Sequence, residues 1–572
     1  MRETDYVIVG AGSAGCVLAA RLSENPRNRV TLLEAGGSDN SISIRMPAAL
    51  SGPMNRARFN WGYLAEAEPT LAGRRLNCPR GRVLGGSSSI NGMVWVRGHA
   101  CDFNSWIERG VHGWSYSDCL PYFKKAENWI GGEDVYRGAG GPLAICRGNH
   151  MRLNPLYQAF VRAAVEAGYP QTGDYNGFQQ EGFGAYQMTV DRGVRASCSR
   201  SYLKPAMRRA NLEVLTGVLA TRVEFEGRRA VAVSYMSRGQ EQSIRARAEV
   251  ILCAGAIGSP ALLQRSGIGP PEVLARAGIP VIHALNGVGG NLQDHLEVYF
   301  QQSCNEPITL NGKLGKLSQA AIGLRWLLFR TGLGATNHFE SGGFIRSSQN
   351  VQWPDIQFHF LPGAIRYDGR SALNGHGFQL HVGPNRMQSR GHVAVRSPDP
   401  DEAPRICFNY LQEEYDRLTF RRAIRLTREI IAQPAMDRFR GEELQPGMAI
   451  KRDDELDHWI AQHAESAYHP SCTCSMGEPE NLESVVDSMC RVIGMECLRV
   501  VDASIFPAIT NGNLNAPVIM VAERAADLIR SRKLLTAVDV PFWVDPEWRT
   551  RQRSGMPQRH SPHQSGTRDL CL

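Results

Sequence analysis

One histidine of this chain stands in a context that suits a general base. His469 directly precedes Pro470, which restricts the local backbone, and it lies in a loop after an expected helix. The unperturbed pKa of imidazole, about 6.5, leaves the neutral form available near pH 7, so His469 can remove a hydroxyl proton. Asn513 can both donate to and accept from a substrate oxygen; alternatively it caps the helix expected to start near Asn515. A base of this kind suits proton abstraction from an alcohol.

Removing a hydride from that alcohol needs an acceptor, and the N-terminus has the pattern of a dinucleotide site. An apolar run ends at Gly10, an expected helix begins near Gly12 and Gly15, and a second apolar run ends at Glu34. Gly10 permits a tight turn, Gly12 lets the backbone approach a pyrophosphate, and Gly15 lets the helix pack on the strand. The helix N-terminus attracts phosphates, and Glu34 can accept hydrogen bonds from ribose hydroxyls. The pattern predicts an adenine dinucleotide, either NAD or FAD. The expected cofactor contacts here are Gly10, Gly12, Ser13, Ala14, Gly15, Glu34 and Ala35.

Bulk composition indicates a large globular protein. The 572 residues are 42% apolar and 21% charged, and a chain of this length is expected to form two or three substructures. The net charge of +8 comes from scattered arginines, which gives no basic patch for nucleic acid. The 14 cysteines show no C-x-x-C pair and no metal-ligand spacing with histidine, so we expect reduced thiols and no metal. Apolar runs are far too short for a membrane span. We expect a cytoplasmic protein that at most contacts the inner membrane peripherally.

The order of the expected elements indicates a discontinuous α/β fold, α+β overall. Strands are expected from residue 5, within 211–255 and at 498–502, and helices at 155–168, 416–432, 453–463 and 515–531. This arrangement predicts a Rossmann-like domain and a discontinuous substrate-binding domain built on an antiparallel sheet. The expected Rossmann-like segments are 1–150, 196–300 and 466–535, the substrate-binding segments are 151–195 and 301–465, and 536–572 form a loosely ordered basic tail.

Longer motifs resemble the signatures of the glucose–methanol–choline oxidoreductases. The segment 81–98, GRVLGGSSSINGMVWVRG, is similar to their first signature, and 255–269, GAIGSPALLQRSGIG, to their second. Further similar segments are 287–295, 468–470 and 501–504, so the resemblance covers about residues 4–533. It implies FAD rather than NAD, hydride transfer from an alcohol carbon to the flavin, and catalytic roles for His469 and Asn513. The cofactor contacts that it adds are Arg82, Val83, Gly85, Ser87, Asn91, Gly92, Met93, Val94, Val218, Asp502, Ala503 and Asn513.

Within the family, the chain most resembles the choline dehydrogenases, through 334–346, 356–362 and 465–474. Choline oxidases attach the flavin through a histidine where this chain has Ile90, and they carry a serine where it has Gly92. The resemblance therefore implies noncovalent FAD. It favours a dehydrogenase that passes electrons to a quinone or other acceptor over an oxidase that uses oxygen.

The same resemblance assigns a substrate pocket. Glu340 is expected to face the trimethylammonium group of choline, because a carboxylate in so apolar a stretch is costly without a cationic partner; an ion pair with Arg346 is the alternative. Trp61 and Tyr468 match aromatic positions around that group, since aromatic faces attract quaternary ammonium, and each also suits core packing. His359 corresponds to a histidine of the same pocket.

The expected reaction is oxidation of choline to betaine aldehyde, with further oxidation to glycine betaine left open. One alternative is a dehydrogenase for another aliphatic or aromatic primary alcohol. The other is a flavoprotein without catalytic activity, against which the intact His469 and Asn513 argue.

Overall fold

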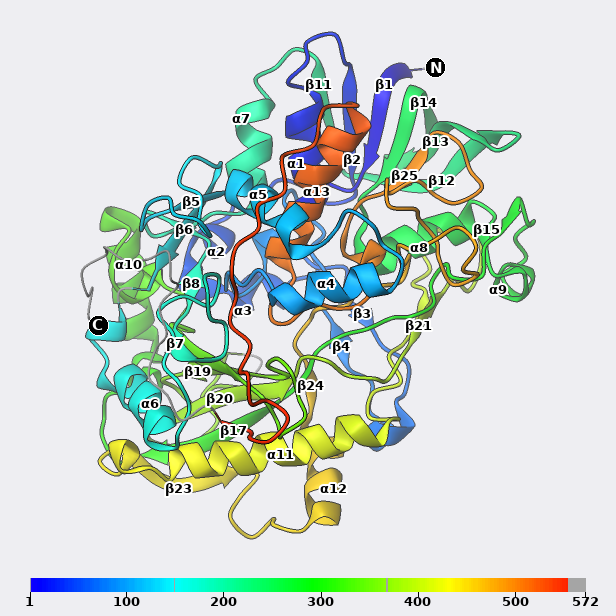
Figure 1. Cartoon of the computed structure of the whole chain (residues 1–572). Helices are drawn as coiled ribbons and strands as arrows, with labels where there is room; N and C mark the ends of the chain where they lie inside the picture. The colour runs from blue at the N-terminus through cyan, green and yellow to red at the C-terminus, as the bar shows by residue number, and fades with distance from the viewer. Residues whose placement is uncertain (1, 149, 367–368, 554–572) are drawn as a thin grey trace.

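The computed structural model describes residues 2–148, 150–366 and 369–553, and two large sheets dominate this part of the chain (Figure 1). The first has the strand order β11-β2-β1-β14-β13-β12, with β25 also paired to β14. Its neighbours around β1 are parallel, whereas β12, β13 and β14 pair antiparallel. The strands are β1 (Arg2–Val9), β2 (Val30–Glu34), β11 (Leu212–Thr216), β12 (Val218–Glu226), β13 (Arg229–Ser237), β14 (Gln240–Leu252) and β25 (Leu498–Val500).

The second sheet is antiparallel throughout, with the order β23-β17-β20-β19-β18-β7 and β24 on β17. Together the two sheets confirm the predicted fold class. The strands are β7 (Gly182–Ala185), β17 (Leu296–Cys304), β18 (Ser341–Ile345), β19 (Ile356–Leu361), β20 (Gly377–Pro384), β23 (Arg440–Gln445) and β24 (Glu465–Ser466). The longer helices are α1 (Ser13–Leu22), α4 (Ala100–Glu108), α5 (Tyr116–Ala126), α6 (Pro155–Glu166), α8 (Gly255–Arg265), α10 (Lys316–Phe329), α11 (Glu414–Ile431), α12 (Asp453–His463) and α13 (Asn515–Ile529).

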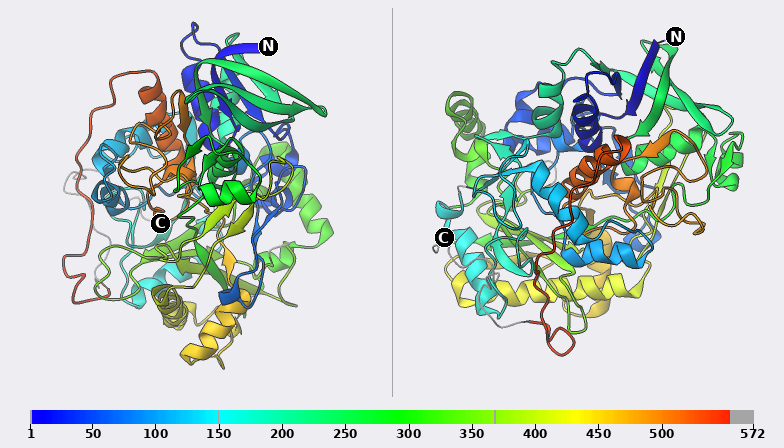
Figure 2. Two further views of the ribbon diagram at one scale, coloured as in Figure 1. Left: turned by 90° about the vertical axis from the view of Figure 1, so that its right-hand side faces the viewer. Right: turned by 45° about the horizontal axis from the view of Figure 1, so that its top comes forward.

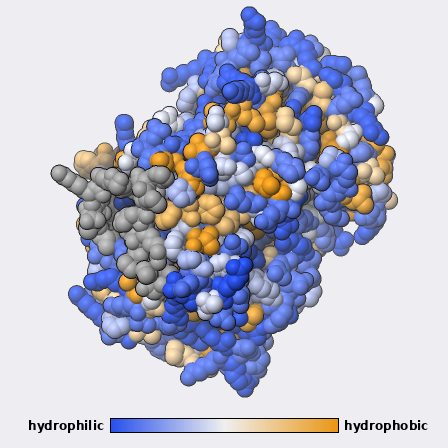
Figure 3. Space-filling model, viewed as in Figure 1, coloured by the Kyte–Doolittle hydropathy of each residue, from blue (hydrophilic) through white to orange (hydrophobic). Residues whose placement is uncertain are grey.

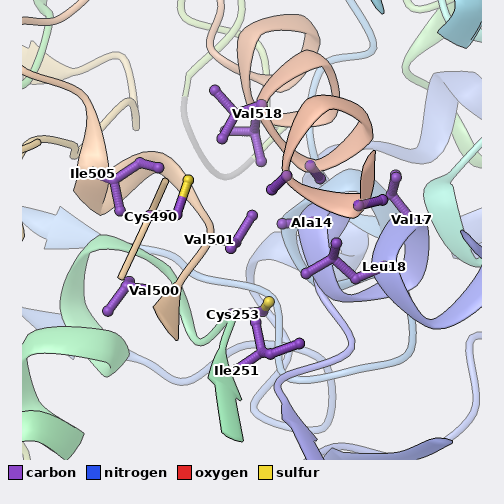
Figure 4. Close-up of a cluster of buried hydrophobic side chains, with 14 of the residues drawn as sticks. Ala14, Val17, Leu18, Ile251, Cys253, Cys490, Val500, Val501, Ile505 and Val518 are labelled. Carbon is purple, nitrogen blue, oxygen red and sulfur yellow. The ribbon is translucent and has the colours of Figure 1, made fainter. Parts of the chain in front are cut away.

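The core of the first half forms where α1 and α13 meet the parallel strands. Figure 4 shows Val17 and Leu18 of α1 in one buried cluster with Ile251 of β14 and Val518 of α13. The contact is tight at the glycine turn, because a Cβ on Gly15 would lie 1.9 Å from the Gly10 carbonyl oxygen. The third glycine of the fingerprint is therefore required by packing between helix and strand.

The second sheet owes its burial to helices on one side. Helix α11 runs along the sheet in Figure 1 and buries Phe420, Ala423, Ile424 and Thr427, which follow the i, i+3, i+4, i+7 spacing of an amphipathic helix. The face of the molecule in Figure 3 is mainly hydrophilic, with apolar side chains in small separate groups. Because α11 covers one side of the antiparallel sheet, the opposite side of the sheet faces the rest of the protein.

Most elements agree with the sequence prediction, with helices α6, α11, α12 and α13 ending within two residues of their expected limits. The first strand begins earlier than expected, because Arg2 already pairs with Ile244. The strands of the two sheets fall in the predicted domain segments, apart from the start of β17 at Leu296 and the end of β24 at Ser466. The domain limits themselves stay a prediction.

The prediction of a loose C-terminal arm is wrong for residues 536–553. Figure 1 shows this segment running down the body, and Asp545, fully buried, pairs with Arg346 at 2.7 Å. Arg551 also contacts Asp545, and Arg553 pairs with Glu429 at 2.6 Å. Of the arginines that suggested a solvated tail, Arg551 and Arg553 therefore pair with carboxylates, and Arg549 lies over the ring of Trp548. Residues 554–572, including Arg559, lie outside the described part.

Candidate active site

A cavity of about 900 Å³ runs between the two sheets. One end lies at the N-terminus of α1, beside Gly12 and Ser13, and the other reaches His469 and Asn513. Parallel strands β1, β2 and β14 direct their carboxyl ends toward the first part, the position where open α/β sheets bind ligands. The cavity therefore connects the nucleotide fingerprint with the predicted catalytic pair, although the two are nearly five hundred residues apart in sequence.

The nucleotide end has the open backbone that a dinucleotide requires. A Cβ on Gly12 would meet only the Cys253 carbonyl oxygen, at 3.8 Å, and Cβ atoms on Gly92 and Gly255 would meet nothing within 4 Å. The free N–H groups at the start of α1 open on the same space. The residues present therefore fit a bound adenine dinucleotide. The predicted contacts that line the cavity are Gly10, Gly12, Ser13, Ala14, Glu34, Ala35, Arg82, Ser87, Asn91, Gly92, Met93, Val94, Val218, Asp502, Ala503 and Asn513.

Three predicted contacts support the cavity from behind. Gly15 packs on Gly10, as described above. Gly85 adopts a left-handed conformation (φ +89°) and donates its backbone N–H to the Ala11 carbonyl at 2.8 Å, so it braces the glycine turn. Val83 is fully buried in a small apolar cluster. None of the three lines the cavity.

Two acids hold the strand ends of the nucleotide site. Glu34 accepts the backbone N–H groups of Ala11 (2.8 Å) and Gly36 (2.7 Å), and burial raises its pKa to about 7. Asp502 accepts from the Gly255 backbone at 2.9 Å and from the Ser259 hydroxyl at 2.6 Å. Each carboxylate thus organises two chain segments while its residue also lines the cavity.

A buried arginine, which sequence reasoning missed, stands behind the flavin-side loop. Arg195 is 2% exposed and donates to the Ile44 carbonyl at 2.9 Å and to the Asn91 carbonyl and side-chain oxygens at 2.6 and 2.8 Å. Burial lowers its pKa to about 9. The guanidinium group of Arg195 orients the Asn91 side chain. The sequence around Arg195 contains no motif that predicts this role.

At the catalytic end, a chain of hydrogen bonds determines which nitrogen of His469 is free to accept a proton. His295 Nε2 lies 3.0 Å from the Asn385 carbonyl, so it must carry the hydrogen. His295 Nδ1 is then an acceptor, and it receives the Nδ1–H of His469 at 3.0 Å. The Nε2 lone pair of His469 is left facing the Asn513 amide, at 3.2 Å. This tautomer is the one a general base needs.

The electrostatics favour the neutral form of that base. Burial, followed by the neighbouring His295 and His359, holds the pKa of His469 well below its usual value. Burial also lowers the pKa of His295 to about 3 and that of His359 to about 4. The loop is fixed by the His469 backbone N–H, which donates to Asp294 at 2.7 Å. An uncharged imidazole is therefore available across the physiological pH range.

Asn513 joins the base to the antiparallel sheet. Gln357 Nε2 donates to Asn513 Oδ1 at 3.3 Å, and His359 Nε2 lies 3.1 Å from the same Gln357 nitrogen. With its oxygen occupied in this way, the Asn513 amide presents its N–H groups to His469 and to the cavity. The alternative role, a cap for α13, is not what its side chain does here, because helix α13 has no side-chain cap.

The recess beyond the base carries a carboxylate that the sequence reasoning did not select. Glu297 lines the cavity and lies 2.8 Å from His381 Nδ1. Strand pairing places Tyr299 opposite His381 and His381 opposite His359, so these rings form a row across β17, β20 and β19. Phe339 packs at 5.1 Å from the His381 ring. An anionic recess with aromatic walls suits an organic cation.

Glu340 takes a different place from the one expected. It does not line the cavity, it is fully buried, and its carboxylate accepts the Met151 backbone N–H (2.8 Å) and the Thr336 hydroxyl (2.5 Å). The alternative, a pair with Arg346, is also absent, since Arg346 pairs with Glu181 and Asp545. Glu340 directly precedes β18 and lies outside the cavity lining, so the structure does not bring it together with the other predicted substrate residues.

The other predicted substrate residues do line the cavity. Trp61 stacks on Tyr63 and has the Arg82 guanidinium 4.8 Å from its ring centroid. Tyr468 holds a left-handed backbone (φ +66°) beside His469, and His359 sits in the ring row. The signal that could have found Glu297 is its period-two spacing with His295 and Tyr299, because alternate residues of a strand share a face.

Comparisons with known proteins agree with this geometry. Models of the N- and C-terminal regions of GMC oxidoreductases match residues 4–297 and 387–522. The chain belongs to the GMC oxidoreductase family. This GMC oxidoreductase is 58% identical over 560 residues to an oxygen-dependent choline dehydrogenase of Photobacterium profundum, which covers 98% of the chain and 99% of the relative. It is 60% identical over 555 residues to the protein of that name from Vibrio vulnificus, covering 97% and 99%.

Solved structures give the same result. Pyridoxine 4-oxidase from Mesorbium loti superposes with a TM-score of 0.84 at 32% identity, covering 93% of this chain and all of that one. A formate oxidase superposes with a TM-score of 0.86 at 26% identity, covering 93% and 98%. The family and fold predicted from the motifs are confirmed, and with them an FAD-dependent oxidoreductase.

Proposed function

We propose that this GMC oxidoreductase oxidises choline to betaine aldehyde. The observation that carries the proposal is the arrangement of one cavity: a neutral base at His469, and beyond it the Glu297 carboxylate with an aromatic wall. A primary alcohol that bears a cation at its far end fits both features at once. Relatives 53–60% identical over nearly the full chain are named oxygen-dependent choline dehydrogenases, which supports the same substrate.

The protein's own residues divide the work. His469 Nε2 accepts the hydroxyl proton, since its Nδ1–H is already committed to His295. An Asn513 N–H donates to the substrate oxygen and steadies the developing alkoxide. FAD, when bound, supplies the hydride acceptor. A betaine aldehyde hydrate presents the same hydroxyl to the same base, so we propose that a second oxidation to glycine betaine uses the same residues.

Recognition of the cation falls to Glu297. Gln379 Nε2 lies 2.8 Å from His381 Nε2 and donates to it, so His381 Nδ1 carries the hydrogen that bonds Glu297. One carboxylate oxygen of Glu297 accepts this hydrogen bond, and the carboxylate gives the recess a negative charge that can attract a cation. The ring faces of Tyr299 and Phe339 add cation–π attraction for a trimethylammonium group.

We propose that the electrons pass to a quinone-type acceptor. We also propose that FAD is held without a covalent bond, because Ile90 stands where choline oxidases have the histidine that attaches the flavin. The names of the relatives include oxygen, so oxygen and a quinone are compared directly in the test. No helix within the described residues is long and apolar enough to cross a membrane.

The test is an anaerobic titration of the purified holoenzyme, followed by the loss of flavin absorbance at about 450 nm, a property of the chromophore itself. Choline is expected to bleach the flavin at low concentration, and betaine aldehyde to follow. The uncharged isostere 3,3-dimethylbutan-1-ol and benzyl alcohol are expected to need far higher concentrations. Reoxidation by ubiquinone and by oxygen then identifies the acceptor. Bleaching by neutral alcohols but not by choline refutes the assignment.

A further inference from the structure

Helix α10 exposes an apolar stripe that has no partner among the described residues. Five large apolar side chains of this 14-residue helix are exposed, and four of them, among them Leu317 at 89% and Leu328 at 64%, lie on one side. At 100° per residue, the stripe covers about 120° of the helix circumference. Its members, all exposed, are Leu317, Ala320, Ala321, Leu324, Leu327 and Leu328. A solvent-facing helix normally places polar residues on this side, so the stripe indicates an interaction surface.

The opposite side of the same helix belongs to the active-site cavity. Gln319 and Ile322 line the cavity, together with Lys313 and Leu314 just before the helix and Leu333 after it. Trp326 anchors this side, because its ring is buried and its Nε1–H donates to the Gly193 carbonyl at 2.6 Å. Figures 1 and 2 show α10 at the edge of the molecule. The helix is thus a wall with the cavity on one side and the exposed stripe on the other.

The charge around the stripe selects the kind of surface it fits. The segment from Pro307 to Phe339 contains no aspartate or glutamate, and its four cations are Lys313, Lys316, Arg325 and Arg330. Lys313, Lys316 and Arg325 are exposed, and no carboxylate of the described residues pairs with them. An apolar stripe flanked by unpaired cations complements an anionic lipid bilayer, whereas a second copy of the chain would bring the same positive charge to the contact.

We propose that α10 docks on an anionic lipid bilayer, with its leucine stripe in the interface and its lysines at the headgroups. At 1.5 Å per residue the helix is about 21 Å long, which suits a helix lying in the interface rather than one that spans the bilayer. Docking brings the cavity wall to the lipid, so a membrane-dissolved quinone enters beside α10. Vesicle binding is independent of the proposed function, and only the route of the acceptor rests on it.

The test measures binding of the full-length holoenzyme to sedimented vesicles. Wild type is expected to bind phosphatidylglycerol-containing vesicles at least tenfold more tightly than pure phosphatidylcholine vesicles, and less tightly at high salt. Leu324→Glu with Leu328→Glu is expected to lower the partition coefficient at least tenfold. The control is Val281→Glu with Ile282→Glu, side chains 49% and 51% exposed in a loop between α9 (Pro271–Arg276) and β16 (His283–Ala284), which is expected to bind as wild type does.

Activity separates the docking from the chemistry. With a water-soluble dye as acceptor, all three proteins are expected to turn over equally, because none of these four side chains lines the cavity. With long-chain ubiquinone in vesicles, only the α10 variant is expected to slow, by at least fivefold. Equal vesicle binding by wild type and the α10 variant overturns the proposal. So does an α10 variant that converts a wild-type dimer into a monomer in sedimentation velocity, because the stripe would then be covered by a second copy.

Discussion

Substituting a single carboxylate is expected to distinguish recognition of the substrate's charge from recognition of its shape. Glu297→Gln keeps the size of the side chain and its contact with His381 but removes the negative charge of the recess. A unit charge pair about 5 Å apart at an effective dielectric constant of about 20 is worth roughly 3 kcal/mol. Since 1.4 kcal/mol corresponds to a factor of ten, the KM for choline is expected to rise about 100-fold.

The matched measurement uses 3,3-dimethylbutan-1-ol, which has the same shape as choline and no charge. Steady-state turnover of both alcohols, with a dye as acceptor, gives the ratio of the two kcat/KM values for each variant. That ratio is expected to fall about 100-fold in Glu297→Gln, while the isostere alone changes by less than about threefold, because only the charge interaction is lost.

Glu340→Gln is the control that the structure supplies. Its carboxylate accepts from Met151 and Thr336 behind the cavity, so the substitution is expected to lower the free energy of unfolding by about 1–3 kcal/mol. Its choline-to-isostere ratio is expected to equal that of wild type. The reverse result, a selective loss of choline in Glu340→Gln and none in Glu297→Gln, would falsify the placement of the cation beside Glu297.

Three further expectations follow from buried polar groups. His295→Leu leaves the Nδ1–H of His469 without its acceptor, so it is expected to lower the flavin-reduction rate about 5- to 100-fold with little change in KM. His295→Gln, whose amide can both accept and donate, is expected to restore most of the flavin-reduction rate. Equal rates in the two variants would contradict the tautomer assignment. His99 has its pKa lowered to about 3 by burial, so the unfolded chain takes up a proton that the folded one refuses, and stability falls as the pH drops below 6.5, by up to about 1.4 kcal/mol per pH unit. His99→Asn keeps a helix cap and is expected to reduce the pH dependence of the Tm between 6.5 and 4.5, while the same change at the 77%-exposed His112 should leave it unchanged. Asp545→Asn uncouples the C-terminal segment from a buried arginine and is expected to cost about 3 kcal/mol in chemical denaturation; an unchanged midpoint would show that the segment is loose after all.

The local sequence was sufficient to predict a feature wherever the residues that determine the feature lie in one segment. The glycine turn at residues 10–15 is required by the contact of Gly15 with the Gly10 carbonyl, and the periodic apolar residues of α11 determine both its length and its buried side. His469 and Asn513 were proposed as catalytic from their side-chain chemistry and from long motifs that keep their order along the chain.

The sequence predictions fail where the role of a residue depends on the direction in which its side chain points. Glu340 stands in an apolar stretch as expected, but it directly precedes β18 and lies outside the cavity lining, whereas Glu297 on β17 lines the cavity beside His381. Arg553 looked solvated because its carboxylate partner, Glu429, lies more than a hundred residues earlier in the chain.

The sequence by itself determined the family and the nucleotide fingerprint and proposed the base, because each depends on residue types at fixed local spacing. Only the tertiary structure decided which nitrogen of His469 can accept a proton, which acid lines the recess beside His381 and which helix stands exposed beside the cavity. The reason is physical. Tautomers, facing and exposure are set by neighbours that strand pairing and packing bring together from distant parts of the chain, and local spacing carries no record of those neighbours.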